Sequence, residues 1–133
     1  MLFTLSIGIF YQPKFKTMKK ILVVDDDPDI LQVVDIILTG EGFNVHTHST
    51  GNNVPEIVDN YHPDLVLLDI QLPGKQGNEI CKDLKHTDSN LPVILFSAHV
   101  KREKAVDVCN ADAFIQKPFD VSHLISTINM HVN

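Results

Sequence analysis

The chain alternates short runs of hydrophobic residues with longer stretches in which hydrophobic residues recur every three or four positions. Five runs are expected to be strands, and they cover residues 21–24, 43–48, 65–68, 93–96 and 113–116. Each run is followed by a segment with helical spacing. Continuous apolar runs of this length are typical of strands buried on both faces of a parallel sheet. The pattern therefore predicts an α/β fold, a doubly wound parallel sheet with helices on both faces.

Capping residues mark several element boundaries. Asp27 followed by Pro28 predicts the start of the first helix, because aspartate caps helices and proline fits the first turn. Asp120 is the expected N-cap of the last helix, whose inner face should hold Val121, Leu124, Ile125 and Ile128. The helix before the fifth strand has the weakest pattern and should end at Asn110. The strand at residues 43–48 is the most polar and is expected at an edge of the sheet.

The composition is that of a single soluble domain. The chain has 133 residues, 44% hydrophobic and 21% charged, so it can bury a core without disulfides or metals. Its net charge of −6 argues against a general electrostatic grip on nucleic acid or an anionic membrane. Cys81 and Cys109 fall in helical patterns and are expected to be packing residues, which fits a reducing cytoplasm.

Residues 1–17 differ from the rest of the chain. They contain no acidic residue and hold four of the chain's nine aromatic residues: Phe3, Phe10, Tyr11 and Phe15. Their apolar run is too short to span a membrane and has no basic stretch before it. We interpret them as an N-terminal extension, either an upstream translation start ahead of Met18 or an added segment. A docking segment that covers apolar surface or joins two subunits is the functional alternative, and a membrane anchor is a further one. Residues 18–133 form the predicted domain.

Polar residues follow four of the expected strands. They are Asp25, Asp26 and Asp27 after the first strand, Asp69 after the third, Ser97 after the fourth and Lys117 after the fifth. Because ligands of doubly wound sheets bind beyond the carboxyl ends of the strands, these side chains are expected on one rim. His46 and His48 on the edge strand lie on one side of it and are expected to be exposed rather than metal-binding.

These residue types suit phosphoryl transfer. Clustered carboxylates repel one another unless a cation lies among them, and a site made only of oxygen ligands suits Mg²⁺. A carboxylate beside the metal can accept a phosphoryl group and form an aspartyl phosphate. A lysine and a hydroxyl can then hold the remaining phosphoryl oxygens.

The same segments resemble the response-regulator receiver family of two-component signalling. The resemblance is carried by ILVVDDD at 21–27, LLDIQLPG at 67–74, Phe96-Ser97-Ala98 and Gln116-Lys117-Pro118-Phe119. It implies a flavodoxin-like sheet of five strands in the order 2-1-3-4-5 with five helices. It also implies a cytoplasmic phosphorelay protein that is not an enzyme acting on other molecules.

The resemblance implies partners as well. The phosphoryl donor would be a sensor histidine kinase or a histidine phosphotransfer protein. No effector domain is expected after the receiver, so output would pass to an unidentified downstream protein or by onward phosphotransfer. Direct contact with nucleic acid or a membrane is not expected, and a homodimer is left open.

The resemblance assigns individual residues to a phosphorylation site. Asp69 would be the phosphorylated aspartate. Mg²⁺ would be held by Asp25, Asp26, Asp69 and the backbone carbonyl of Gln71. Ser97 and Lys117 would bind the phosphoryl group.

A second set of positions concerns the switch. Phe114 falls at the family's switch aromatic, whose rotamer follows the residue at the Ser97 position. Lys117-Pro118 resembles a bond that is typically cis in the family. His99 falls where the family tunes the phosphoryl lifetime. The segment between Ser97 and Lys117 is shorter than is usual in the family, so a standard output surface on its helix is in doubt.

Other classes of protein stay open at this point. A degenerate receiver would act as an interaction module that takes no phosphate. A Mg²⁺-dependent phosphatase of the haloacid dehalogenase type also uses an aspartate at a strand end, but its second aspartate falls where this chain has Gln71. A flavin-binding protein of flavodoxin type would need a phosphate-binding loop after the first strand, and this chain has three aspartates there.

Overall fold

The computed structural model describes residues 18–98 and 109–132. Its elements are β1 (Lys20–Val24), α1 (Pro28–Gly40), β2 (Asn44–His48), α2 (Val54–Tyr61), β3 (Leu65–Asp69), α3 (Gly77–Thr87), β4 (Val93–Ser97), β5 (Ala113–Gln116) and α5 (Val121–His131). Three expectations concern residues 1–17 and 99–108: the extension, the helix before β5 and the role of His99. All three lie outside the described residues.

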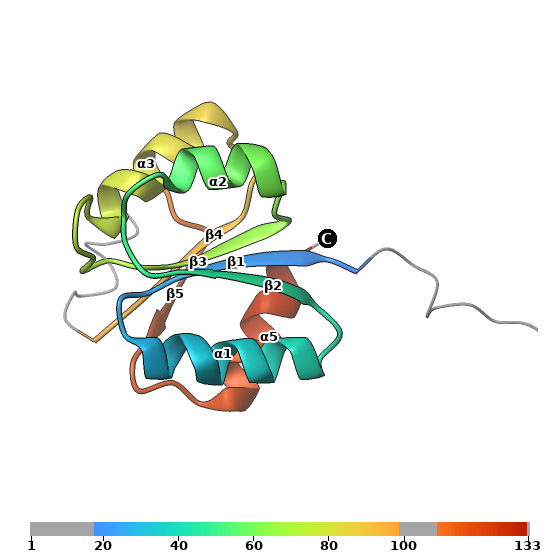
Figure 1. Cartoon of the computed structure of the whole chain (residues 1–133). Coiled ribbons are helices and arrows are strands. Elements are labelled where there is room, and N and C mark those ends of the chain that lie inside the picture. The colour runs from blue at the N-terminus through green and yellow to red at the C-terminus, as the bar shows by residue number, and fades with distance from the viewer. Residues whose placement is uncertain (1–17, 99–108, 133) are drawn as a thin grey trace, which may run out of the picture.

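The strands form one parallel sheet of order β2-β1-β3-β4-β5, as predicted. In Figure 1, α2 and α3 lie on one face of the sheet, and α1 and α5 lie on the other. β3 and β4 are buried along their whole length, whereas β2 is largely exposed. The doubly wound fold and the edge position of β2 are therefore confirmed.

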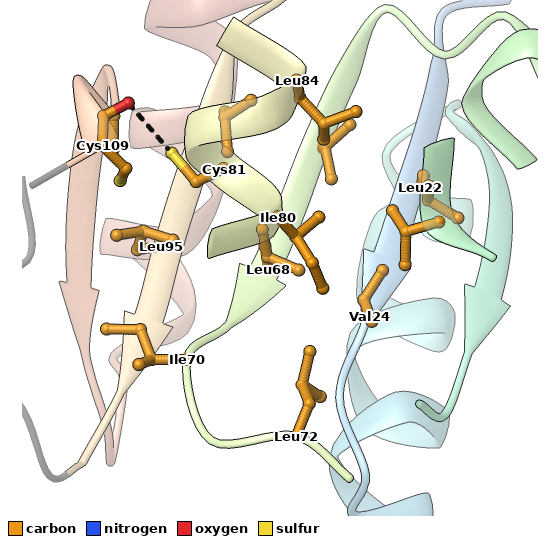
Figure 2. Close-up of a cluster of buried hydrophobic side chains, with 14 of the residues drawn as sticks. Leu22, Val24, Leu68, Ile70, Leu72, Ile80, Cys81, Leu84, Leu95 and Cys109 are labelled. Carbon is orange, nitrogen blue, oxygen red and sulfur yellow. Dashed lines mark hydrogen bonds between the residues drawn. The ribbon is translucent and has the colours of Figure 1, made fainter. Parts of the chain in front are cut away.

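Two hydrophobic clusters fill the two sides of the sheet. The cluster under α2 and α3 is drawn in Figure 2, and it includes Cys81, Cys109 and Phe114. The Cys81 thiol donates a hydrogen bond to the carbonyl oxygen of Cys109, 3.5 Å away. Neither cysteine forms a disulfide bond, and both are buried, which confirms their expected packing role. The opposite cluster joins α1 and α5 to the sheet through residues such as Val34, Leu38, Leu124 and Ile128.

The helix boundaries follow the capping residues. The carboxylate of Asp27 accepts hydrogen bonds from the backbone N–H groups of Asp29 and Ile30, at 2.9 and 3.4 Å. Asp120 caps α5 by accepting from the backbone N–H of Ser122 at 2.8 Å. Asn110 has the left-handed φ of 61° expected at a helix end.

The inner face of α5 differs from the prediction at one position. Val121 was expected to be buried but is 48% exposed, because it opens the helix. Thr127 is buried instead. A threonine is tolerated there because its hydroxyl donates to the carbonyl of His123 at 2.7 Å.

None of the described helices has the length and apolar character needed to cross a lipid bilayer.

Candidate functional site

The carboxyl ends of β1, β3 and β5 meet at one edge of the sheet, where they surround a pocket. The pocket has a volume of about 340 Å³ and is lined by Asp25, Asp26, Asp27, Ile30, Asp69, Gln71, Ala98 and Lys117. We call it the acidic pocket. It brings together five predicted site residues from segments far apart in the sequence.

Asp25 lies at the floor of the acidic pocket and is fully buried. Its backbone N–H donates to the carbonyl of His48 at 3.1 Å, which fixes the turn after β1. One carboxylate oxygen accepts from the backbone N–H of Asp27 at 2.8 Å, and the other accepts from Lys117 Nζ at 2.5 Å. Burial raises the pKa of Asp25 above its usual value, because these two hydrogen bonds only partly offset the loss of solvent.

Asp69 and Asp26 complete a group of three carboxylates. Asp69 is 6% exposed, and its carboxylate faces Lys117 Nζ at 3.2 Å. Asp26 is exposed and borders solvent. One oxygen from each of Asp25, Asp26 and Asp69 lies within 4.8 Å of the other two. The group thus grades from a fully buried acid to an open one, which leaves one side of the cluster accessible.

Lys117 bridges the two buried acids. Its Nζ also lies 4.5 Å from the centre of the Phe96 ring, so the ammonium is held over an aromatic face. Burial alone would lower the pKa of Lys117, but the hydrogen bond to Asp25 and the charges of Asp69 and Asp25 outweigh it and raise the pKa. The peptide bond to Pro118 is cis, as expected from the resemblance.

The net charge of the three carboxylates and Lys117 bears on whether these residues suit Mg²⁺. The three carboxylates face one lysine, so full ionisation leaves two negative charges in a pocket with an open side. Oxygen ligands of this kind, with room for water, are the set that Mg²⁺ prefers. Gln71 lines the same pocket, and its backbone N–H donates to Asp69 at 3.4 Å. The donor set therefore fits a hard divalent cation.

The two predicted switch residues lie outside the pocket lining. Ser97 is buried, and its carbonyl accepts from the backbone N–H of Lys117 at 3.2 Å, while Ala98 lines the pocket. Phe114 is 7% exposed and is paired in register with Leu95. Its side chain belongs to the hydrophobic cluster under α2 and α3. The structure therefore brings Ser97 next to Lys117 and places Phe114 in the core.

Gly77 supports the site and was not singled out from the sequence. Its backbone N–H donates to the carbonyl of Ile70 at 2.7 Å. A Cβ at this position would lie 1.9 Å from the backbone oxygen of Asp69, so only glycine allows α3 to start this close to the acid. A glycine just before a helical pattern was the available signal, but the sequence does not show what such a glycine contacts.

The fold is a doubly wound α/β domain with three clustered acids and a bridging lysine at the ends of its strands. The model of the response regulator receiver domain family matches residues 21–129. The chain therefore belongs to the response regulator receiver domain family, and the resemblance inferred from the sequence is confirmed.

Curated relatives and solved structures agree with this assignment. The DNA-binding response regulator MtrA of Mycolicibacterium smegmatis is 36% identical over 115 residues, which make up 83% of this chain and 49% of that protein. The DNA-binding transcriptional regulator NtrC of Klebsiella pneumoniae is 34% identical over 84% of this chain and 24% of its own length. This chain thus spans half or less of the length of these relatives.

Receiver domains of known structure superpose closely on the fold. The BeF3-activated N-terminal receiver domain of RstA from Klebsiella pneumoniae has a TM-score of 0.81 at 28% identity, covering 86% of this chain and 99% of that one. A CheY-like receiver domain protein from Methanospirillum hungatei has a TM-score of 0.82 at 29% identity, covering 87% and 94%.

Proposed function

We propose that this chain takes a phosphoryl group on Asp69 from a sensor histidine kinase or a histidine phosphotransfer protein in the cytoplasm. The phosphorylated chain then changes conformation and regulates a partner protein or passes the phosphoryl group on. The observation that carries the proposal is Lys117 Nζ, which lies 2.5 Å from Asp25 and 3.2 Å from Asp69 in a pocket open to solvent at Asp26.

The residues divide the chemistry among them. An oxygen of Asp69 attacks the phosphorus, a P–O bond forms, and the P–N bond of the donor's phosphohistidine breaks. The released imidazole nitrogen takes up a proton from solvent. Lys117 holds an oxygen of the transferred group and balances its charge, while Asp25 keeps the ammonium in place. Mg²⁺ held by Asp25, Asp26, Asp69 and the Gln71 carbonyl would neutralise charge shared by the acids and the phosphoryl oxygens.

The proposed switch runs from Ser97 to Phe114. Ser97 ends the buried strand β4, and its carbonyl accepts from the backbone N–H of Lys117 at 3.2 Å. In the proposal its hydroxyl binds a phosphoryl oxygen once the group is on Asp69. Phe114 lies two residues before Gln116, the register partner of Ser97. A movement of Ser97 would therefore alter the packing around Phe114 and shift the balance between two conformations.

The first test is the intact mass of the protein after incubation with acetyl phosphate, with and without Mg²⁺. We expect one phosphoryl adduct that depends on Mg²⁺ and is absent in Asp69→Asn. Asp27→Asn is the matched control, because Asp27 lines the same pocket but is the cap of α1 rather than a proposed ligand. An adduct that persists in Asp69→Asn would overturn the assignment of the acceptor.

Two alternatives make different predictions, one in the same experiment and one in a turnover assay. A degenerate receiver would bind Mg²⁺ and give no adduct. A Mg²⁺-dependent phosphatase would release phosphate from small esters with repeated turnover. The phosphatase is disfavoured because Gln71 lies in the pocket where that class has its second acid, and an amide cannot exchange a proton with the leaving group.

A further inference from the structure

A groove opens between α2 and α3, at the end of the sheet opposite the acidic pocket. Both helices lie on the same face of the sheet (Figure 1), and the groove between them has a volume of about 400 Å³. Val58, Leu84 and Leu91 are among the residues that line it. We call it the α2–α3 groove. Half of its lining residues are apolar, of which Leu84 and Leu91 are only 4% and 7% exposed, so the groove is less polar than the acidic pocket at the other end.

Acidic residues also line the α2–α3 groove. Asp59 and Asp88 are exposed there, and neither forms an ion pair with any residue that the structure describes. The third acid, Asp83, is paired with Lys75. A groove with apolar lining and unpaired carboxylates favours an occupant that carries both apolar and basic side chains.

The groove continues toward the point where the chain enters the sheet. A second pocket, of about 290 Å³, shares Pro63, Asp88 and Leu91 with the groove and extends to Asp64. The carboxylate of Asp64 accepts a hydrogen bond from the backbone N–H of Lys20 at 2.7 Å. The start of β1 is therefore fixed beside this second pocket.

The preceding residues have the chemistry that the groove favours. Residues 1–17 contain Lys14, Lys16 and no acid, whereas residues 18–133 contain all 17 acidic residues of the chain. Phe10, Tyr11 and Phe15 stand on either side of the first lysine. A segment of this length can extend up to about 55 Å, more than enough to cross a small domain.

We propose that residues 1–17 dock in the α2–α3 groove of their own chain. The aromatic side chains cover the exposed parts of Val58, Leu84 and Leu91, and the lysines lie near Asp59 and Asp88. The extension then belongs to the folded unit, at the end of the sheet away from the acidic pocket. This inference does not depend on phosphorylation and stands even where Asp69 accepts no phosphoryl group.

Hydrogen exchange on the full chain tests the docking. We compare the natural chain with a chain carrying Phe10→Asp and Tyr11→Asp, which keeps the length and removes the apolar contact. We expect faster exchange in the variant at residues 55–63 and 84–91, and unchanged exchange at residues 34–40 of α1 on the opposite face. Equal exchange at residues 55–63 and 84–91 in the two chains would overturn the proposal.

A second measurement separates docking from a general effect of charge. The loss of thermal stability caused by Phe10→Asp and Tyr11→Asp is measured again in the background of Asp59→Asn and Asp88→Asn. It is also measured in the background of Glu41→Gln, an exposed acid at the end of α1 on the other face. We expect the loss to shrink several-fold in the groove background only. Equal losses in both backgrounds would contradict the proposed contact.

The oligomeric state decides whose groove is filled. If the exchange protection grows with protein concentration and light scattering gives the mass of a dimer, the segment fills the groove of a second copy. Protection that appears only when a basic peptide is added identifies a partner protein as the occupant. Either result overturns docking within one chain.

Discussion

Two lysines pair with carboxylates at opposite ends of the sheet, and their hydrogen bonds are satisfied in different ways. Lys85 Nζ donates to the carbonyls of Ser89 and Leu91 at 2.9 and 3.0 Å and to the carboxylate of Asp112 at 2.8 Å. Lys117 Nζ faces two carboxylates and an aromatic ring. Both side chains are largely buried, at 10% and 16% exposed.

The two lysines differ in how much negative charge remains uncompensated around them. An ammonium has three donors, and Lys85 uses all of them on neutral carbonyls and one carboxylate. Its acid, Asp112, is also satisfied by the backbone N–H of Val93 at 2.8 Å. Lys117 serves two acids with a third close by, so negative charge remains in its pocket. The complete hydrogen bonding of Lys85 stabilises the fold, whereas the excess negative charge around Lys117 favours the binding of a ligand.

The largest expected effect is on phosphorylation. Lys117→Met should slow formation of the Asp69 adduct by about 10²-fold or more, because a charged donor at the transferred group is lost. Lys85→Met should leave the rate unchanged, since Lys85 lies at the far end of the sheet. The rates are measured by intact mass after incubation with acetyl phosphate. Equal rates in the two variants would show that Lys117 has no special role in phosphorylation and would contradict the distinction between the two lysines.

For the free energy of unfolding, in contrast to the rate of phosphorylation, the substitution of Lys85 should have a large effect. Lys85→Met removes the ammonium donor from the carbonyls of Ser89 and Leu91 and leaves Asp112 with only the backbone N–H of Val93. We expect a loss of about 2 kcal/mol in the free energy of unfolding, measured by urea denaturation. Lys75→Met is the matched control, because its pair with Asp83 is exposed and should contribute little. A loss in Lys75→Met as large as that in Lys85→Met would contradict the proposal that the buried hydrogen bonds of Lys85 stabilise the fold.

Asp25 should lower stability at neutral pH when Mg²⁺ is absent. Its pKa in the folded state is raised above 3.8 by burial, so the folded state binds this proton more tightly than the unfolded state does. Stability from this group is therefore present at low pH and falls as pH rises from 3.8 through the folded pKa.

Asp25→Asn should therefore make the loss of stability with rising pH smaller and raise the melting temperature near neutral pH. The amide keeps the size of the side chain and an oxygen that can accept from the backbone N–H of Asp27. Melting temperatures are measured in EDTA across this pH range for the natural chain and for Asp25→Asn. A variant that melts lower than the natural chain near neutral pH would show that the pair with Lys117 outweighs the cost of burial.

The sequence predicted the convergence at the strand ends because that feature depends only on topology. Once the apolar runs are parallel strands, the residues after them must share an edge, and Asp25, Asp69 and Lys117 follow. The same pattern predicted both helix caps, because a cap depends on neighbouring residues alone.

Features that depend on exact distances were not predictable. The contact between Gly77 and the backbone of Asp69 joins a helix start to a strand end, and no local pattern encodes it. The three bonds of Lys85 come from a loop and a distant strand end in the same way. The burial of Thr127 in place of Val121 reflects where α5 begins on the sheet. The hydrophobic pattern of the sequence determines the topology, whereas the exact packing depends on contacts between residues that are far apart in the sequence.

The smallest expected effect is the response of stability to Mg²⁺. Binding to the folded state alone should raise the free energy of unfolding by about 1.4 kcal/mol at a Mg²⁺ concentration ten times Kd. Asp26→Asn should reduce this gain, because Asp26 is the exposed member of the three carboxylates. Asp27→Asn should keep it, although both aspartates line the pocket. The midpoint of urea denaturation across a Mg²⁺ titration measures the gain in each chain. A gain that survives Asp26→Asn unchanged would place the cation away from the open side of the pocket, and the charge left over by Lys117 would then need another explanation.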